Sequence, residues 1–212
     1  YYRENGGIIF PNPNAPTAIY EELDFIEDIL EHNRDSIVIV DEAYVDFAGR
    51  SAMELIGKYD NLIVTQTFSK ARSLAGMRIG YAISNPDLIR CLNDVKYSFN
   101  SYTMSRAAIV CGSAAVEDRA YFEKSVRRIK ETRERTKEEL AKLGFEFTDS
   151  KANFLFARHP RYDGGRLFRE LRDANIYVRH WDDERIGQYL RITVGTDEEM
   201  DTLLDFLRKQ LS

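Results

Sequence analysis

Short runs of apolar, mostly β-branched residues recur through the first half of this chain, and they limit what it can fold into. They lie at residues 8–10, 37–40, 62–67 and 79–83, and a helical spacing of apolar residues covers 19–30. Continuous apolar runs of this length are typical of strands buried on both faces. We expect the last three runs to be parallel strands. The alternation predicts an α/β fold with a mostly parallel sheet covered on both faces.

The second half of the chain has a different pattern of charged and apolar residues. Residues 117–143 are highly charged and carry one narrow apolar stripe, as expected for either a solvated surface helix or a helix that connects two domains. Gly144 is a typical helix C-cap. Beyond it we expect short strands at 145–147, 154–157, 176–178 and 190–194, and helices at 165–173 and 197–210. The predicted organisation is a larger domain (1–116), a connecting helix (117–143) and a small α+β domain (144–212).

Charge and composition exclude several classes of function. The net charge of -5 and the pI near 5.4 argue against nucleic acid as a partner. The longest apolar run, residues 107–111, is too short to cross a membrane. Two cysteines make no disulfide framework, which favours a cytoplasmic protein, and we expect no metal site.

Polar residues follow two of the predicted strands. Asp41 closes the run at 37–40, where open α/β sheets bind ligands, and a carboxylate there either caps the next helix or meets a cation such as a protonated pyridine nitrogen. Lys70 ends the segment Thr-Gln-Thr-Phe-Ser-Lys after the run at 62–67. Thr67, Ser69 and Arg78 add hydroxyl groups and a guanidinium, which suit a phosphate dianion.

Three further positions carry possible contacts. Asn14 lies in an Asn/Pro-rich turn that either binds a ligand oxygen or has no role, and Tyr44 lies close enough to Asp41 to reach the same oxygen. Arg191 lies within the apolar run at 190–194, so it must meet an anion. That anion is either an internal acid or the α-carboxylate of an amino-acid substrate.

Five motifs occur together in a fixed order: Asn-Ala-Pro-Thr, Asp-Glu-Ala-Tyr, Thr-Phe-Ser-Lys, Met-Arg-Ile-Gly-Tyr and Leu-Arg-Ile-Thr-Val-Gly-Thr. The set resembles the fold-type-I pyridoxal-phosphate aminotransferases over the whole chain, and within them the histidinol-phosphate aminotransferases most of all. The resemblance implies pyridoxal 5'-phosphate as cofactor and a homodimer. It also implies amino transfer between histidinol phosphate and 2-oxoglutarate or glutamate.

The same resemblance implies a role for each matching residue. Lys70 would be the Schiff-base lysine, Asp41 the pyridinium partner and Tyr44 the phenolate donor. The remaining positions would be phosphate ligands, a second phenolate donor and substrate contacts: Thr67, Ser69 and Arg78; Asn14; and Arg191, Arg179 and Asn153. The usual Asn-Asn-Pro-Thr-Gly motif reads Asn-Ala-Pro-Thr-Ala here, so the phenolate-binding Asn is either Asn14 with a shifted backbone or absent.

The chain also departs from the family in length, and alternative functions stay open. Complete members of the resembling family are longer at the N-terminus, so we expect an N-terminally truncated chain that is inactive by itself. The rival functions are an aromatic aminotransferase or a threonine-phosphate decarboxylase, both of the same fold. A rival of another class is a catalytically silent interaction domain.

Overall fold

The computed structural model describes residues 1–211, and the chain divides into two compact units. Unit 1 comprises Tyr1–Asn14 and Tyr20–Glu123, and unit 2 comprises Ala15–Ile19 and Lys124–Ser212. Hydrogen bonds attach the short loop segment to unit 2, since the backbone N–H of Lys151 donates to the carbonyl of Ala18 at 2.9 Å. The three-part division expected from the sequence stays a prediction.

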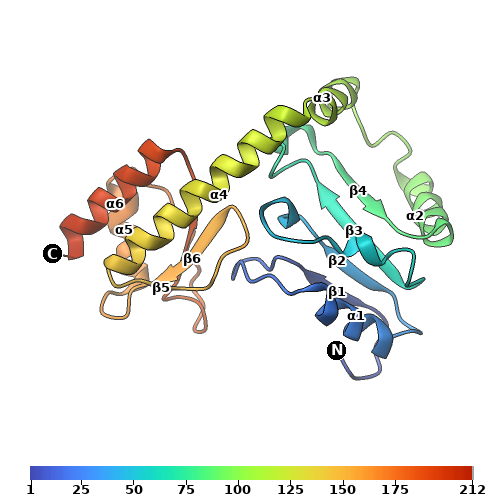
Figure 1. Cartoon of the computed structure of the whole chain (residues 1–212), viewed down its shortest axis with the longest axis horizontal. Coiled ribbons are helices and arrows are strands. Elements are labelled where there is room, and N and C mark those ends of the chain that lie inside the picture. Colours follow the sequence, from blue (N-terminus) through green and yellow to red (C-terminus); the bar gives the residue numbers. More distant parts are fainter. Residues whose placement is uncertain (212) are drawn as a thin grey trace. The chain divides into compact units, whose positions relative to one another are not determined.

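Unit 1 is built on a four-stranded sheet in the order β1-β2-β3-β4 (Figure 1). The strands are β1 (Ile8–Pro11), β2 (Val38–Asp41), β3 (Leu62–Thr67) and β4 (Gly80–Ile83). The β1–β2 and β2–β3 pairs are parallel, as predicted, whereas β4 runs antiparallel to β3. The prediction of a parallel strand at 79–83 is therefore wrong. The connection before β4 contains only the 3-10 helix η3 (Ala75–Met77), and a parallel return would need a longer crossover.

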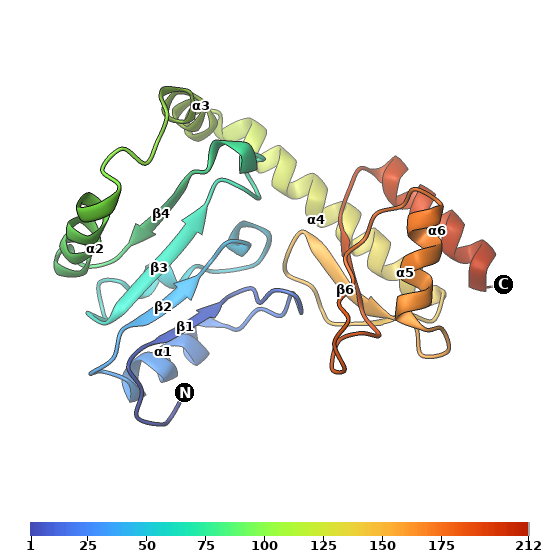
Figure 2. The ribbon, with the colours of Figure 1, turned by 180° about the vertical axis from the view of Figure 1, so that it is seen from behind.

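Helix α1 (Leu23–His32) covers one face of this sheet (Figures 1 and 2). Its buried residues Leu23, Ile26, Ile29 and Leu30 share one core with alternate strand residues: Ile8, Phe10, Val38, Val40, Leu62 and Val64. Burying such side chains contributes roughly 1.5–3 kcal/mol each, before the entropy of ordering them.

The helix begins at Leu23, four residues later than the sequence pattern predicted, and Ile19 stays 41% exposed. The cause is a local set of hydrogen bonds. The side chain of Asn12 accepts from the backbone N–H of Glu21 at 2.8 Å and donates to its carbonyl at 2.9 Å. Both backbone groups of Glu21 are thus satisfied outside a helix.

The opposite face of the sheet departs from the prediction of cover on both sides. Ile9, Ile39 and Ile63 are adjacent in register on this face, and Ile9 is 71% exposed. Within residues 1–211, the face is therefore open at the β1 edge.

Two helices follow β4. Helix α2 (Pro86–Phe99) begins at an N-cap, Asn85, and none of its residues is buried. Helix α3 (Arg106–Glu117) was not expected from the sequence, and it packs through its small residues. A Cβ atom on Gly112 would lie 2.8 Å from Cδ1 of Ile79, so the helix approaches this point closely. Ala108, Ile79 and Phe68 form a small core that fixes the chain just before the predicted site lysine.

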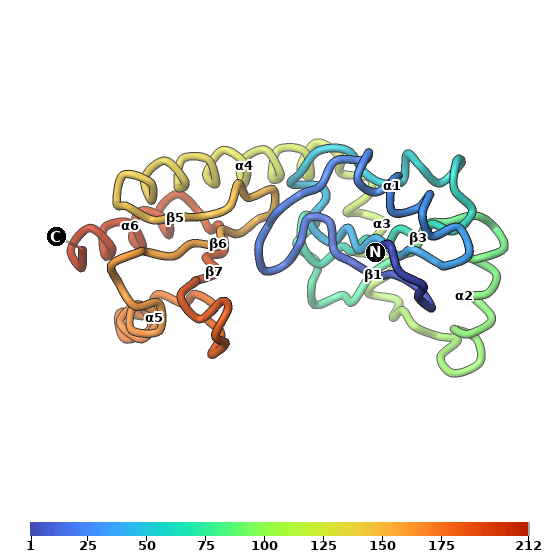
Figure 3. Tube along the Cα trace, turned by 90° about the horizontal axis from the view of Figure 1, so that it is seen from below, coloured from blue at the N-terminus to red at the C-terminus, as the bar shows by residue number. Residues whose placement is uncertain are grey.

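Unit 2 contains most of helix α4 (Arg119–Lys142) and a three-stranded antiparallel sheet (Figure 3). The remaining elements are β5 (Glu146–Phe147), β6 (Phe154–Arg158), α5 (Gly164–Asp173), β7 (Leu190–Thr193) and α6 (Asp197–Leu211). Gly144 adopts φ +84°, which confirms its predicted role in ending the helix. Leucines of α4, α5 and α6 share one core with Leu155 and Ile192 of the sheet.

The strand predicted at 176–178 is wrong. Ile176 instead closes helix α5, because its N–H donates to the carbonyl of Leu171 at 2.8 Å. Only Arg179 pairs with the sheet, through an isolated antiparallel bridge to Arg191. The apolar residues at 176 and 178 are partly buried against the core of the unit rather than within a strand.

Candidate functional site

The carboxyl ends of β2 and β3 lie at one edge of the sheet because the two strands are parallel. Asp41 is the last residue of β2 and is in register with Thr65. Ser69 and Lys70 lie two and three residues after Thr67, the last residue of β3. The topology therefore brings a carboxylate, a hydroxyl and an amine to the edge where open α/β sheets bind ligands.

Lys70 lies beside an aromatic ring and has no acid partner. Its Nζ is 5.2 Å from the centroid of the Tyr44 ring, and Tyr44 is 9% exposed. No carboxylate within residues 1–211 forms an ion pair with this amine. A lysine held by a ring face rather than by an acid keeps its nitrogen available for chemistry.

Asp41 is partly exposed. Its Oδ1 accepts from the backbone N–H of Ala43 at 3.0 Å, a bond within the turn after β2. It does not cap the next helix, η1 (Val45–Phe47), whose N-cap is Tyr44, so the capping alternative is wrong. No cation pairs with Asp41 among the residues that the structure describes. A carboxylate has about four acceptor positions, so this one bond leaves room for a second partner.

Two hydroxyl groups form a compact turn after β3. The backbone N–H of Ser69 donates to Oγ1 of Thr67 at 3.1 Å, and the two side-chain oxygens lie 2.9 Å apart. The Thr67 hydroxyl also lies 3.2 Å from the carbonyl of Ile79. The turn thus brings the two hydroxyl groups together within three residues of Lys70.

Arg78 lies two residues before β4, which begins at Gly80. It adopts left-handed backbone angles (φ 56°, ψ 42°), which end η3 and interrupt the extended chain. Its Nη1 donates to the carbonyl of Ala75 at 2.9 Å. No acid within residues 1–211 pairs with this exposed guanidinium, which leaves donors for an anion.

Glu42 is a buried carboxylate that the sequence analysis did not identify. It is 1% exposed, and it accepts from the Ser51 hydroxyl at 2.5 Å, the Ala52 N–H at 2.6 Å and the Gln66 amide at 2.8 Å. Burial raises the pKa of Glu42, and these three hydrogen bonds offset part of that effect. The sequence did contain a sign of this residue, because Glu42 directly follows Asp41. Successive residues of an extended chain point to opposite sides, so one of two adjacent acids is expected to point away from the site.

The network extends to β4. Gln66 and Tyr81 are in register, and the Tyr81 hydroxyl donates to Oε1 of Gln66 at 2.6 Å. Glu42 therefore couples the end of β2 to β3 and β4 through directed hydrogen bonds.

Asn14 lies in the loop after β1 and is partly exposed. The preceding Asn12 fixes this loop through its two bonds to Glu21. The role of Asn14 stays a prediction.

Unit 2 contains the other predicted residues. Arg191 lies on β7 with its guanidinium 5.1 Å from the Phe154 ring centroid and 5.7 Å from that of Trp181. Its Nε is buried and has no hydrogen-bond partner. Arg179 lies 5.5 Å from the same Trp181 ring, and neither arginine pairs with an acid within residues 1–211. The internal acid that the sequence left possible is therefore absent from the described chain, and an external anion fits the site.

Asn153 directly precedes β6. Its carbonyl accepts from the N–H of Val194 at 2.9 Å, and the residue is partly exposed. Asn153 precedes β6 and Val194 follows β7, so this bond lies at one end of the β6–β7 pair that contains Arg191.

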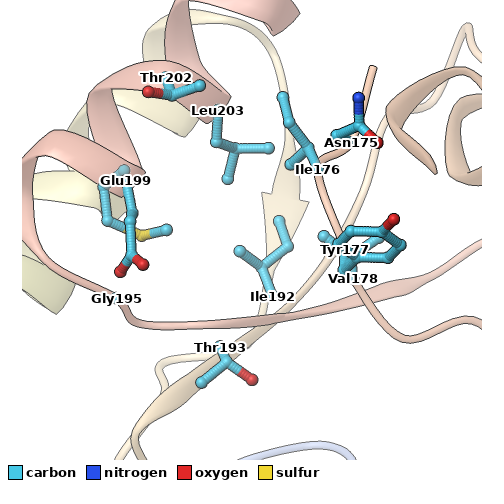
Figure 4. Close-up of a pocket in the computed structure, with 11 residues that line it drawn as sticks. Asn175, Ile176, Tyr177, Val178, Ile192, Thr193, Gly195, Glu199, Thr202 and Leu203 are labelled. Carbon is cyan, nitrogen blue, oxygen red and sulfur yellow. The ribbon is translucent and has the colours of Figure 1, made fainter. Parts of the chain in front are cut away.

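A separate cavity of about 380 Å³ lies between the start of α6 and the segment 175–178 (Figure 4). Its lining is mostly apolar, and it includes neither arginine. Glu199, which points toward it, already accepts from the N–H of Thr196 at 2.7 Å and so caps the helix. Nothing in the lining matches the predicted chemistry.

No group of three or more potential metal-ligating side chains occurs within residues 1–211. Over the same range, every helix is too short or too polar to cross a membrane.

Comparison with known proteins identifies the family. Residues 2–207 match the family described as aminotransferase class I and II. A histidinol-phosphate aminotransferase of Lactococcus lactis subsp. cremoris (strain SK11) is 54% identical over 211 residues, which is 100% of this chain and 59% of that protein. The chain thus spans about three-fifths of the length of this relative.

Solved structures agree in fold. The histidinol-phosphate aminotransferase of Sinorhizobium meliloti, in complex with pyridoxal-5'-phosphate, has a TM-score of 0.85 and 26% identity. The match covers 97% of this chain and 58% of that one. The histidinol-phosphate aminotransferase of Clostridium acetobutylicum has a TM-score of 0.85 and 26% identity, and the match covers 97% and 64% of the two chains.

Proposed function

This chain belongs to the class I and II aminotransferases, and on that premise we propose that it serves amino transfer between histidinol phosphate and 2-oxoglutarate. The relatives at 54% identity support the choice of substrates. The observation that carries the proposal is Lys70, an amine without an acid partner, three residues after the end of β3; β3 pairs with β2, the strand that ends in Asp41.

The residues of unit 1 fit pyridoxal 5'-phosphate, which would be the cofactor. The cofactor needs an amine, an anion beside its ring nitrogen, donors to its phenolate oxygen and cationic or hydroxyl groups at its phosphate. Lys70 supplies the amine and Asp41 the anion. Neither side chain forms an ion pair within residues 1–211. The other groups are Tyr44 and Asn14 for the phenolate, and Thr67, Ser69 and Arg78 for the phosphate.

When bound, pyridoxal phosphate supplies an electron sink for the carbanion that forms at the substrate Cα. Lys70 would hold the cofactor covalently, and its amine is the group that would accept and return the proton of the substrate Cα. Asp41 would keep the ring nitrogen protonated, because a charge-assisted hydrogen bond favours the charged form.

In unit 2, Arg191 binds the α-carboxylate of glutamate, and Arg179 binds the phosphate of histidinol phosphate. The buried, unpartnered Nε of Arg191 supports an external anion at this position. Asn153, at the start of β6, is the third substrate contact. We further propose that the enzyme acts as a homodimer in the cytoplasm.

The test uses the complete product of the gene, because this chain spans 59% of its relative's length. The protein, supplied with pyridoxal phosphate, should form glutamate from 2-oxoglutarate and histidinol phosphate. Faster turnover of phenylalanine or tyrosine would identify an aromatic aminotransferase instead. Release of carbon dioxide from threonine phosphate would identify a decarboxylase, and inertness toward all of them would favour an interaction domain.

A further inference from the structure

The ring of Trp181 lies beside two arginines that have no acid partner. The guanidinium carbons of Arg179 and Arg191 lie 5.5 Å and 5.7 Å from the centroid of its ring. Arg179 and Trp181 are two residues apart, so they point to the same side of an extended segment. The intervening His180 stacks on Phe168 instead.

Positive side chains on two directly paired residues repel each other. Their backbones are hydrogen-bonded across an isolated bridge, so the residues cannot separate without breaking it. No carboxylate within residues 1–211 neutralises either charge. The contacts that do offset the repulsion are aromatic: the electron-rich faces of Trp181 for both, and of Phe154 for Arg191.

We propose that Trp181 is a positioning residue of the substrate anion site. Its indole ring holds Arg179 and Arg191 in one orientation, so that their donors face the anionic end of a substrate. This inference rests on the proposed function, in which the two arginines bind the substrate phosphate and carboxylate. An aromatic ring serves this role better than an acid, because it orients the cations without neutralising them.

If Trp181 had a purely structural role, replacing it should have the same effect as replacing Tyr189, which packs in the same aromatic cluster. Phe156 contacts both rings: it stacks on Tyr189 at 4.4 Å and meets Trp181 edge-on at 6.2 Å. The ring of Tyr189 also contacts a guanidinium, since the guanidinium carbon of Arg158 lies 5.5 Å from its centroid. Arg158, however, is paired with Glu146 at 2.8 Å. Tyr189→Leu is therefore a matched control that disturbs the same aromatic cluster but removes a ring whose guanidinium partner is already neutralised by an acid.

The first experiment uses the 212-residue chain, in which Trp181 is the single tryptophan. Its fluorescence is measured while inorganic phosphate is added. We expect a saturable change in emission, which Arg191→Ala weakens by on the order of tenfold in phosphate affinity and Arg158→Ala leaves unchanged. Emission that does not respond to phosphate, or responds equally in Arg158→Ala, overturns the proposal.

The second experiment uses the complete enzyme and separates KM from kcat. Trp181→Leu should raise the KM for histidinol phosphate and for glutamate on the order of tenfold, with kcat changed by less than about threefold. Trp181→Phe keeps a ring face and should recover most of the loss, whereas Tyr189→Leu should leave both KM values near wild type. Equal effects of Trp181→Leu and Tyr189→Leu, or an unchanged KM in Trp181→Leu, overturn the proposal.

The two experiments separate this inference from the proposed function. If the complete enzyme does not turn over histidinol phosphate, the proposed function fails. The fluorescence titration still decides whether Trp181 and the arginines form one anion site.

Discussion

Arg179 and Arg191 face each other across an isolated antiparallel bridge, in which each backbone N–H donates to the other's carbonyl, at 3.0 Å and 2.8 Å. The bridge sets two positive side chains close together at a point where the described chain offers no acid. Solvent at the exposed Arg179 and the aromatic rings beside both arginines offset part of the repulsion between them, and an anion from outside would offset more of it.

The two arginines should differ in the substrate that they serve. Arg179→Ala should raise the KM for histidinol phosphate more than for glutamate, and Arg191→Ala should do the reverse. Loss of one charge-assisted hydrogen bond corresponds to about 1.5–3 kcal/mol. Steady-state kinetics of the complete enzyme measures this, with Arg161→Ala as the control at an exposed arginine of the same unit. Equal losses for both substrates in both variants would reject the division.

Lys70 should be the lysine that binds the cofactor covalently. Borohydride reduction of the complete enzyme should attach the cofactor to the peptide that contains Lys70, one of nine lysines in this chain. Lys70→Ala should lose the visible absorbance of the lysine-bound cofactor, while Lys124→Ala, in the exposed part of α4, should retain it. Mass spectrometry of the reduced peptides decides the point, and label on any other lysine would refute the assignment.

Asp41 should affect turnover more than cofactor affinity. Asp41→Asn replaces the carboxylate with a neutral amide, which cannot keep the ring nitrogen protonated, so kcat should fall by orders of magnitude. The cofactor should remain bound, with a loss of about 1.5–3 kcal/mol for one charge-assisted hydrogen bond. Cofactor titration and kcat are measured on the same preparation. Near-normal turnover would show that Asp41 only caps the turn through Ala43.

Glu42 should stabilise unit 1 through its three donors. Glu42→Leu leaves the Ser51 hydroxyl, the Ala52 N–H and the Gln66 amide without their acceptor. Each buried unsatisfied group costs about 1–3 kcal/mol, so we expect the free energy of unfolding to fall by about 3 kcal/mol or more. Urea unfolding followed by circular dichroism measures the loss. The exposed Glu54 provides the control, since Glu54→Leu should change stability by less than about 1 kcal/mol. A similar loss in both variants would contradict the network's role.

Asp149 should contribute to the acid stability of unit 2. Hydrogen bonds from Lys137 and Lys151 lower its pKa from 3.8 to about 2. A lowered carboxylate pKa stabilises the folded state above the unfolded pKa near 3.8, and this contribution disappears as the pH falls toward about 2. The side chain is 66% exposed, so the effect should be small and should shrink with added salt.

Acid unfolding followed by Trp181 fluorescence tests this. Asp149→Asn should lower stability at pH 5 and make it less dependent on pH between 4 and 2. Asp173→Asn is the control, because this exposed residue of α5 has no ion pair within residues 1–211. The same pH profile in wild type and Asp149→Asn would exclude the contribution.

The sequence predicted the parts of the fold that depend on local pattern. The runs at 8–10, 37–40 and 62–67 are strands β1, β2 and β3, because β-branched runs between helical segments have few other uses. It failed where long-range contacts decide: the direction of β4, the late start of α1 and helix α3. These depend on a connection too short for a crossover, on the bonds from Asn12 to Glu21, and on the packing of Gly112 against Ile79.

The sequence by itself determined the class of chemistry, because the ordered motifs place an acid at the end of β2, and an amine and a guanidinium in the connection between β3 and β4. Only the tertiary structure decided which charges have partners. It left Lys70 and Arg191 without acids, gave Glu42 three donors, and set Trp181 beside two arginines. The physical reason is that a charge's environment is made by residues distant in sequence, so burial and pairing appear only when the chain has folded.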